Sequence, residues 1–166
     1  MAGLKFADTP TSVLAGVLNR DPGESVGSYP IGQGSLVSNS NYTIGFNTGT
    51  FVISYGVCLL YNPAHGVKAG ATIPIKLQLC GAGGANASSS AVTLTAVQLT
   101  LVSTSTSGAV MDAGNSNPDG DFRFDASLGP GYIFNLKTKG LAHGTYQLRI
   151  AVSNDPNPLF VTFQVN

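Results

Sequence analysis

Apolar and polar residues alternate along most of the chain from Tyr29 onward, and this period of two is typical of half-buried β-strands. In the first third the alternating runs are short, and turn residues such as GQG, NSN and NTG separate them. The runs SYPI, GSLVS, NYTIGF and GTFVIS therefore predict short β-segments between residues 28 and 54. We place a domain boundary near Ser54, with a small β module over residues 1–53.

Residues 1–27 carry a mixed pattern. Asp8 or Thr9 would cap a helix that has Pro10 at its first position, and Gly16 would end this helix after one or two turns. The run AGVLNRD equally fits a strand, and DPGESVG is expected to be a loop because of its Pro and Gly content.

Alternation is stronger over residues 54–166, where turn signals separate seven strand candidates. These are residues 55–61, 72–80, 92–103, 122–125, 131–137, 144–153 and 159–165. This number and spacing are typical of an Ig-like sandwich. In the run LAHGTYQLRIAV, Tyr146 is expected to be the corner tyrosine of such a sandwich, with its hydroxyl bonded to nearby backbone. The sequence thus predicts an all-β chain whose second part is a seven-stranded Ig-like β-sandwich.

The composition favours an extracellular surface protein. Charged residues make up 10% of the chain against roughly 25% in ordinary soluble domains, so Ser, Thr, Asn and Gln must supply the polar surface. Eight basic residues balance eight acidic ones and no basic run occurs, which disfavours a nucleic-acid partner and a charge-driven membrane partner. The longest apolar run, AVTLTAVQLTLV, carries alternating Thr residues and is expected to be a strand, so we expect no membrane insertion.

Cys58 and Cys80 are the only cysteines, and both lie in apolar strand-like runs. No CxxC pair and no neighbouring His provides a zinc-site spacing. Two buried free thiols remain an alternative, but an extracellular composition favours a disulfide. The closed loop would contribute roughly 3 kcal/mol on a chain-entropy estimate.

Residues 8–53 resemble the later part of the MBG repeat of bacterial surface proteins. The resemblance is carried by a D-T-x-x-x-V-L-x-G-x-L-x-R-x-x-G-E-x-V-G-x-Y-x-I run followed by G-x-L-x-x-x-x-N-Y-x-I-x-F. Its residues are Gly23, Glu24, Val26, Gly27, Tyr29, Gly34, Leu36, Asn41, Tyr42 and Ile44. The resemblance implies a secreted, tandem, adhesin-type stalk module with a β-grasp-like fold. Such repeats begin with a further strand or two, so we expect residues 1–53 to be a partial MBG-like module with an open edge.

Residues 54–166 resemble the PxKF-type domain of secreted multidomain bacterial proteins. VKAGATIPIKLQL, with Pro74 and Lys76, and GYIFNLKTKGLAHGTYQLRI carry this resemblance. Leu77 stands where the family has Phe, which is a conservative exchange of core residues.

No sequence pattern indicates catalysis. His65 and His143 each lie beside a Gly in an expected turn, and the chain has no G-x-S-x-G, H-E-x-x-H or P-loop pattern. We therefore expect a protein that is not an enzyme and that needs no cofactor.

Two binding chemistries stay open. The loop DAGNSNPDGDFRFD brings together oxygen side chains of the kind that Ca²⁺ prefers, although its spacing is not that of an EF-hand. The weak calcium candidates are Asp112, Asn115, Asn117, Asp119 and Asp121. An exposed tyrosine platform for glycans would use Tyr42, Tyr55, Tyr61 and Tyr132, whereas strand tyrosines are mostly half-buried core residues.

Lys76 suggests one covalent alternative, an isopeptide bond with an acid such as Asp121 or Asp125 nearby. This requires a buried lysine. If Ile75 and Leu77 face inward, Lys76 instead faces solvent, and we favour this register.

The sequence therefore predicts an extracellular structural or stalk module of a bacterial surface or secreted protein. Its expected partners are neighbouring domains of the same protein or identical subunits. A first alternative is a subunit of a self-assembling extracellular filament, joined by strand addition at the open edge of residues 1–53. A second alternative is a Ca²⁺- or glycan-dependent adhesin module.

Overall fold

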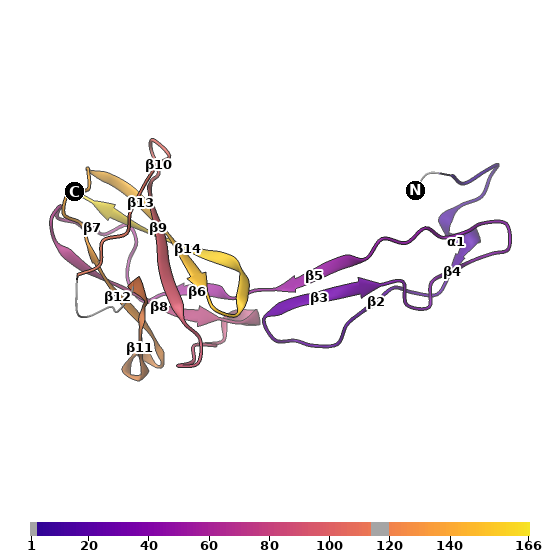
Figure 1. Ribbon diagram of the computed structural model, residues 1–166, viewed down its shortest axis with the longest axis horizontal. Helices are drawn as coiled ribbons and strands as arrows, with labels where there is room; N and C mark the ends of the chain where they lie inside the picture. Colours follow the sequence, from indigo (N-terminus) through magenta and orange to yellow (C-terminus); the bar gives the residue numbers. More distant parts are fainter. Residues whose placement is uncertain (1–2, 114–119) are drawn as a thin grey trace. The chain divides into compact units, whose positions relative to one another are not determined.

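The computed structural model describes residues 3–113 and 120–166, which divide into two compact units at Ile53 and Ser54 (Figure 1). Both units are built from β-strands, which confirms the all-β fold class. In the described residues every pair of strands is antiparallel except the parallel pair of β7 (Gly66–Val67) and β14 (Asp155–Val165). Within the described residues no helix has the length and apolar character that crossing a bilayer requires.

The first unit opens with a single helical turn, α1 (Pro10–Val13). Thr9 is the N-cap, and a reciprocal capping box with Ser12 satisfies the exposed N–H groups of the turn. Pro10 occupies the first helical position, where its missing N–H costs nothing. The predicted short helix is therefore confirmed, with Thr9 rather than Asp8 as its cap.

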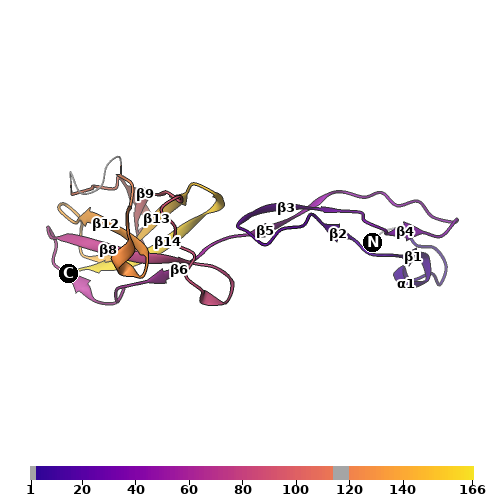
Figure 2. The ribbon, with the colours of Figure 1, turned by 90° about the horizontal axis from the view of Figure 1, so that it is seen from below.

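Five short strands follow in the first unit: β1 (Leu14–Ala15), β2 (Asn19–Arg20), β3 (Gly27–Gly32), β4 (Val37–Ser38) and β5 (Gly49–Ile53). They form a β1–β4 pair and a β2–β3–β5 sheet, whose strands run side by side in Figures 1 and 2. The predicted runs at SYPI and GTFVIS are thus strands, whereas GSLVS contributes only the two residues of β4.

The predicted strand at NYTIGF is wrong, because residues 42–48 belong to no strand. The β3–β5 ladder ends at the Ile31–Gly49 pair. Beyond it the chain turns at Gln33–Leu36, where the Leu36 N–H donates to the Gln33 carbonyl oxygen at 3.1 Å. Gly34 lies in the left-handed region, with φ of 59°, so close to the Val17 backbone that a Cβ would clash. The strand that follows this turn, β4, pairs with β1 and forms no ladder with residues 42–48.

The described residues of the second unit form nine strands: β6 (Gly56–Leu59), β7 (Gly66–Val67), β8 (Thr72–Cys80), β9 (Leu94–Leu101), β10 (Thr106–Gly108), β11 (Arg123–Asp125), β12 (Gly131–Lys137), β13 (Gly144–Val152) and β14 (Asp155–Val165). Single 3₁₀ turns, η1 (Ala82–Gly84) and η3 (Ala126–Leu128), lie in the connections that the structure describes. All seven predicted strands are present, and the two additional strands, β7 and β10, have only two and three residues.

These strands form two sheets, β10–β9–β13–β14–β7 and β11–β12–β8–β6, which enclose one apolar core (Figure 1). Alternation sets the register of each strand: along β8, Ile73, Ile75, Leu77 and Leu79 point into the core. Phe134 of β12 and Phe163 of β14 fill the core from the two opposite sheets.

Two local predictions for the sandwich are confirmed. The Tyr146 hydroxyl donates to the carbonyl oxygen of Ala142 at 3.1 Å, four residues earlier, as in a tyrosine corner. Cys58 and Cys80 form a disulfide with a Cα–Cα distance of 5.9 Å. The bond joins β6 to β8 within one sheet, and does not bridge the two sheets.

Candidate functional site

The first unit has almost no core of its own. Among its described residues, 3–53, Val13 alone has a buried side chain. Large apolar side chains are exposed instead, including Val17 at 69% and Val37 at 55%. Burying a side chain of this size contributes roughly 1.5–3 kcal/mol, so this unit lacks much of the stabilisation that a closed β domain has.

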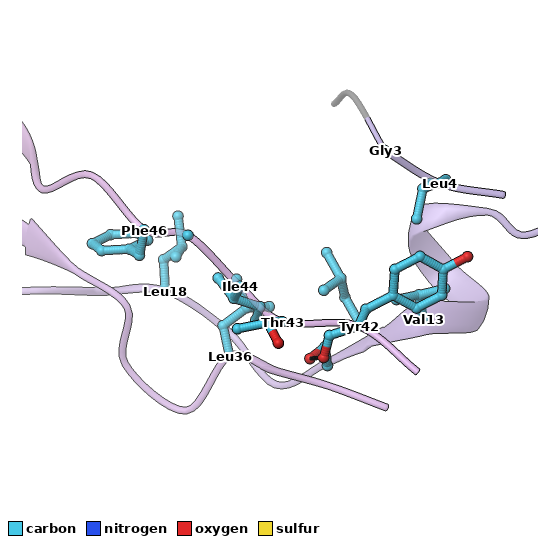
Figure 3. Close-up of a pocket in the computed structure, with 12 residues that line it drawn as sticks. Gly3, Leu4, Val13, Leu18, Leu36, Tyr42, Thr43, Ile44 and Phe46 are labelled. Carbon is cyan, nitrogen blue, oxygen red and sulfur yellow. Dashed lines mark hydrogen bonds between the residues drawn. The ribbon is translucent and has the colours of Figure 1, made fainter. Parts of the chain in front are cut away.

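An open apolar groove of about 410 Å³ lies between the beginning of the unit, β1, β4 and residues 42–46 (Figure 3). Figure 3 shows Leu18, Ile44 and Phe46 at one end of it, and Leu4, Val13 and Tyr42 at the other. The remaining lining residues are Gly3, Leu14, Leu36, Ser38, Thr43 and Gly45. The groove thus combines aliphatic side chains from four separate segments of the unit.

One wall of this groove has unused backbone hydrogen-bonding groups. Residues 43–48 run beside the groove, and their N–H groups donate to no other residue that the structure describes. β5, which follows directly, pairs with β3 on one side and is an edge strand of its sheet. An unpaired N–H and C=O row beside apolar side chains is the arrangement that accepts an added strand.

Tyr42 ties the beginning of the chain to the end of the groove. Its hydroxyl donates to a carboxylate oxygen of Asp8 at 2.7 Å and accepts from the Lys5 N–H at 3.1 Å. The hydrogen bond to Asp8 raises the pKa of the Tyr42 phenol above its ordinary value. These contacts hold residues 4–8 over one end of the groove.

A second cluster in the first unit explains much of the R-x-x-G-E-x-V-G-x-Y motif. The Arg20 guanidinium lies over the rings of Tyr29 and Phe51, at 5.2 and 4.9 Å from their centroids. It also donates to the Gly23 carbonyl oxygen at 2.9 Å and pairs with Glu24. Gly23 is required because a Cβ would lie 2.3 Å from the Tyr29 ring. The motif therefore shapes a turn against the β2–β3–β5 sheet. Phe51 lies outside the motif, and the sequence pattern alone did not reveal that its ring contacts Arg20.

The sequence-predicted candidates in the second unit are dispersed. His65 and His143 are exposed. Lys76 is half-buried on the outward side of β8, while Ile75 and Leu77 face the core, so the predicted outward register holds and the buried lysine that an isopeptide bond needs is not found.

The four tyrosines do not present a common exposed ring platform. Tyr132 is 1% exposed, and its hydroxyl donates to the Ser89 carbonyl oxygen. Tyr61 is half-buried and donates to Thr162, and burial raises the pKa of its phenol to about 12. Tyr55 is also half-buried, and Tyr42 belongs to the first unit.

Three of the five calcium candidates, Asn115, Asn117 and Asp119, lie outside the described residues. The other two are placed by the sandwich. Asp121 accepts a hydrogen bond from the Thr95 hydroxyl, and Asp112 forms a β-bridge with Leu136. Among the described His, Cys, Asp and Glu residues, no group of three or more is arranged to hold a metal ion. Calcium binding by this loop stays a prediction.

The family comparison matches the first unit. Residues 1–52 match the family model of the MBG domain (YGX type), which supports the predicted MBG-type repeat and fits an extracellular surface module. No curated protein matches the chain. A solved structure similar to it is the S-layer protein SbsC, domains 4 and 5, at 13% identity and a TM-score of 0.34. That alignment covers 84% of this chain and 58% of the S-layer chain, and at this TM-score it supports no inference. The match to the MBG domain thus covers the first of the two units and leaves the second unmatched.

Proposed function

We propose that the chain is a non-enzymatic structural module of an extracellular bacterial surface or secreted protein, in which it forms part of a stalk. The observation that carries this proposal is the MBG match over residues 1–52. Further support comes from the second unit, a sandwich with one continuous core and a disulfide, which is the kind of bond that persists in oxidising compartments. The PxKF-type assignment of residues 54–166 is part of the same proposal.

Protease treatment of intact cells that produce the protein tests this location. We expect antibodies against the second unit to label intact cells or the medium, and the label on cells to disappear after brief proteolysis. A cytosolic enzyme in the same culture serves as the control for lysis. If the protein is recovered only together with that enzyme, after lysis, the proposed location is wrong.

We propose strand addition at the groove of the first unit as a second candidate function. It is favoured by the coincidence of an apolar groove with the unused N–H groups of residues 43–48. The occupant that we propose is an extended segment of an identical subunit, which would produce a filament.

Light scattering with size-exclusion chromatography of the full chain, over a wide range of concentrations, tests this second candidate. We expect concentration-dependent oligomers, and we expect Ile44→Asp to abolish them by placing a charge in the groove. Val97→Asp is the matched control, because Val97 is an exposed apolar residue of the second unit at 46%. A chain that stays monomeric at all concentrations, or two variants with equal effects, would refute strand addition between copies.

A further inference from the structure

Tension along the second unit would enter at Ser54 and leave at Asn166, the two ends of that unit. The first strand after Ser54 is β6, an edge strand of four residues that pairs only with β8. Gly56 lies opposite Cys80, so tension arriving through β6 falls first on the β6–β8 ladder. This ladder has only four register pairs, and each hydrogen bond has a net contribution of about 1 kcal/mol. Two side-chain bonds to β14 assist it: the Tyr55 N–H donates to Asp155, and the Ser54 hydroxyl accepts from Asn157.

The strand beside β6 is anchored far better. β8 has nine residues, lies between β6 and β12, and shares six register pairs with β12. Its inward side chains Ile75, Leu77 and Leu79 are at most 1% exposed in the shared core. Displacing β8 along its axis would therefore strain a whole ladder and the core at the same time.

The disulfide joins these two strands at the point where tension enters. Cys58 lies opposite Gln78 in the ladder, so its bond to Cys80 runs diagonally to the last residue of β8. Leu79 faces the core, and strand alternation places Cys80 on the other face of the sheet. The bond therefore fastens the outer side of one sheet and takes no part in filling the core.

We propose that the Cys58–Cys80 bond is a staple that transfers tension from the edge strand β6 to the internal strand β8. Residues 59–79 then form a closed loop that tension cannot extend. This loop contains β7, which pairs in parallel with β14 through Gly66–Gln164 and Val67–Val165. With the disulfide intact, the force passes from Cys58 directly to Cys80 and does not run along the backbone of β7. Without it, β6 detaches first and β7 becomes the next point of resistance.

This inference deepens the proposed stalk function and rests on it for its biological meaning, but its test uses the isolated chain. Failure of the test would overturn the staple alone, whereas the surface location is tested by proteolysis of intact cells. The two failures are therefore distinguishable.

Single-molecule force spectroscopy of the full chain, with handles at both ends, tests the staple. In the variant Cys58→Ala/Cys80→Ala we expect an early extension of up to about 40 Å, as residues 54–65 detach, followed by a main rupture at lower force. The oxidised protein should lack this early step. Its total extension should be shorter by about 75 Å, because the disulfide spans a sequence separation of 22 residues. The first unit contributes equally in both proteins.

A second arm does not depend on the folding of the variant. Oxidised wild-type chain is held at constant force, and dithiothreitol is added; it reduces the S–S bond to two thiols and is itself oxidised to a cyclic disulfide. We expect a lower rupture force on the next extension of the refolded, reduced chain. Equal rupture forces before and after reduction, with no early step in the reduced chain, would overturn the proposal.

Discussion

Replacing Leu77 by Ala is the sharpest test of how β8 lies in the sandwich. Leu77 is 0% exposed and pairs with Leu59 and Tyr132 on the two neighbouring strands. Truncating a fully buried leucine removes its transfer free energy and leaves a cavity, at a cost of about 2–5 kcal/mol in the free energy of unfolding. Because native domains are stable by only about 5–15 kcal/mol, this is a large fraction of the total.

Lys76→Ala is the matched control one residue away. Lys76 is half-buried on the outward side of the strand, and its removal should change the free energy of unfolding by at most about 0.5 kcal/mol. Urea unfolding of the oxidised chain, followed by far-UV circular dichroism at neutral pH, measures both values. The disulfide must stay intact in both variants, so that the unfolded states are comparable.

The two variants together test the register. A slip of one residue would exchange the inward and outward sets along the whole strand. If Lys76→Ala destabilises the second unit as much as Leu77→Ala, the described register is wrong. That outcome would also revive the buried lysine that an isopeptide bond requires.

Three further predictions follow from single contacts. Tyr146→Phe should lower the free energy of unfolding by about 1 kcal/mol in the same urea assay, because it removes the hydrogen bond to Ala142 and keeps the ring stacked on Phe163. An unchanged urea midpoint would contradict the tyrosine corner. Because the pKa of the Tyr61 phenol is raised, the contribution of this group to the free energy of unfolding is fully present below pH 10 and is lost as the pH rises towards about 12. Tyr61→Phe should therefore flatten the fall in stability over this pH range. An identical fall in both proteins would contradict the raised pKa of Tyr61. Gly23→Ala should disorder the turn at Arg20 and Tyr29, because both the φ of 143° at Gly23 and the nearby Tyr29 ring oppose a Cβ. NMR spectra should then lose the ring-current shifts that the Tyr29 ring causes. Unchanged shifts would argue against the packing of Gly23 on Tyr29.

The fold of the second unit could be predicted closely because each strand buries one face. Alternation alone placed β8 at residues 72–80 and β12 at 131–137, the bounds that the structure has. It missed β7 and β10, because two or three residues are too few to show a period. The pairing of β7 with β14 depends on residues about a hundred positions apart, which no local pattern encodes.

The first unit was harder to predict because little of it is buried. The apolar residues of NYTIGF predicted a strand, but a strand needs a partner, and the strand after the turn at Gln33–Leu36, β4, pairs with β1 instead. The sequence predicted an open edge in this unit, but it did not predict which residues line the groove. Its lining by Val13, Leu18 and Ile44 comes from segments that only the folded chain brings together.

Whether Cys58 and Cys80 are disulfide-bonded in the protein on living cells is the most direct test of the proposed extracellular stalk module. Cells that produce the protein are treated with an alkylating reagent before lysis, and the peptides containing Cys58 and Cys80 are then examined by mass spectrometry without reduction. We predict that the two peptides are recovered joined to each other and unalkylated, as expected for a stapled module in an oxidising extracellular setting. Recovery of both cysteines as alkylated free thiols would contradict both the staple and the extracellular location.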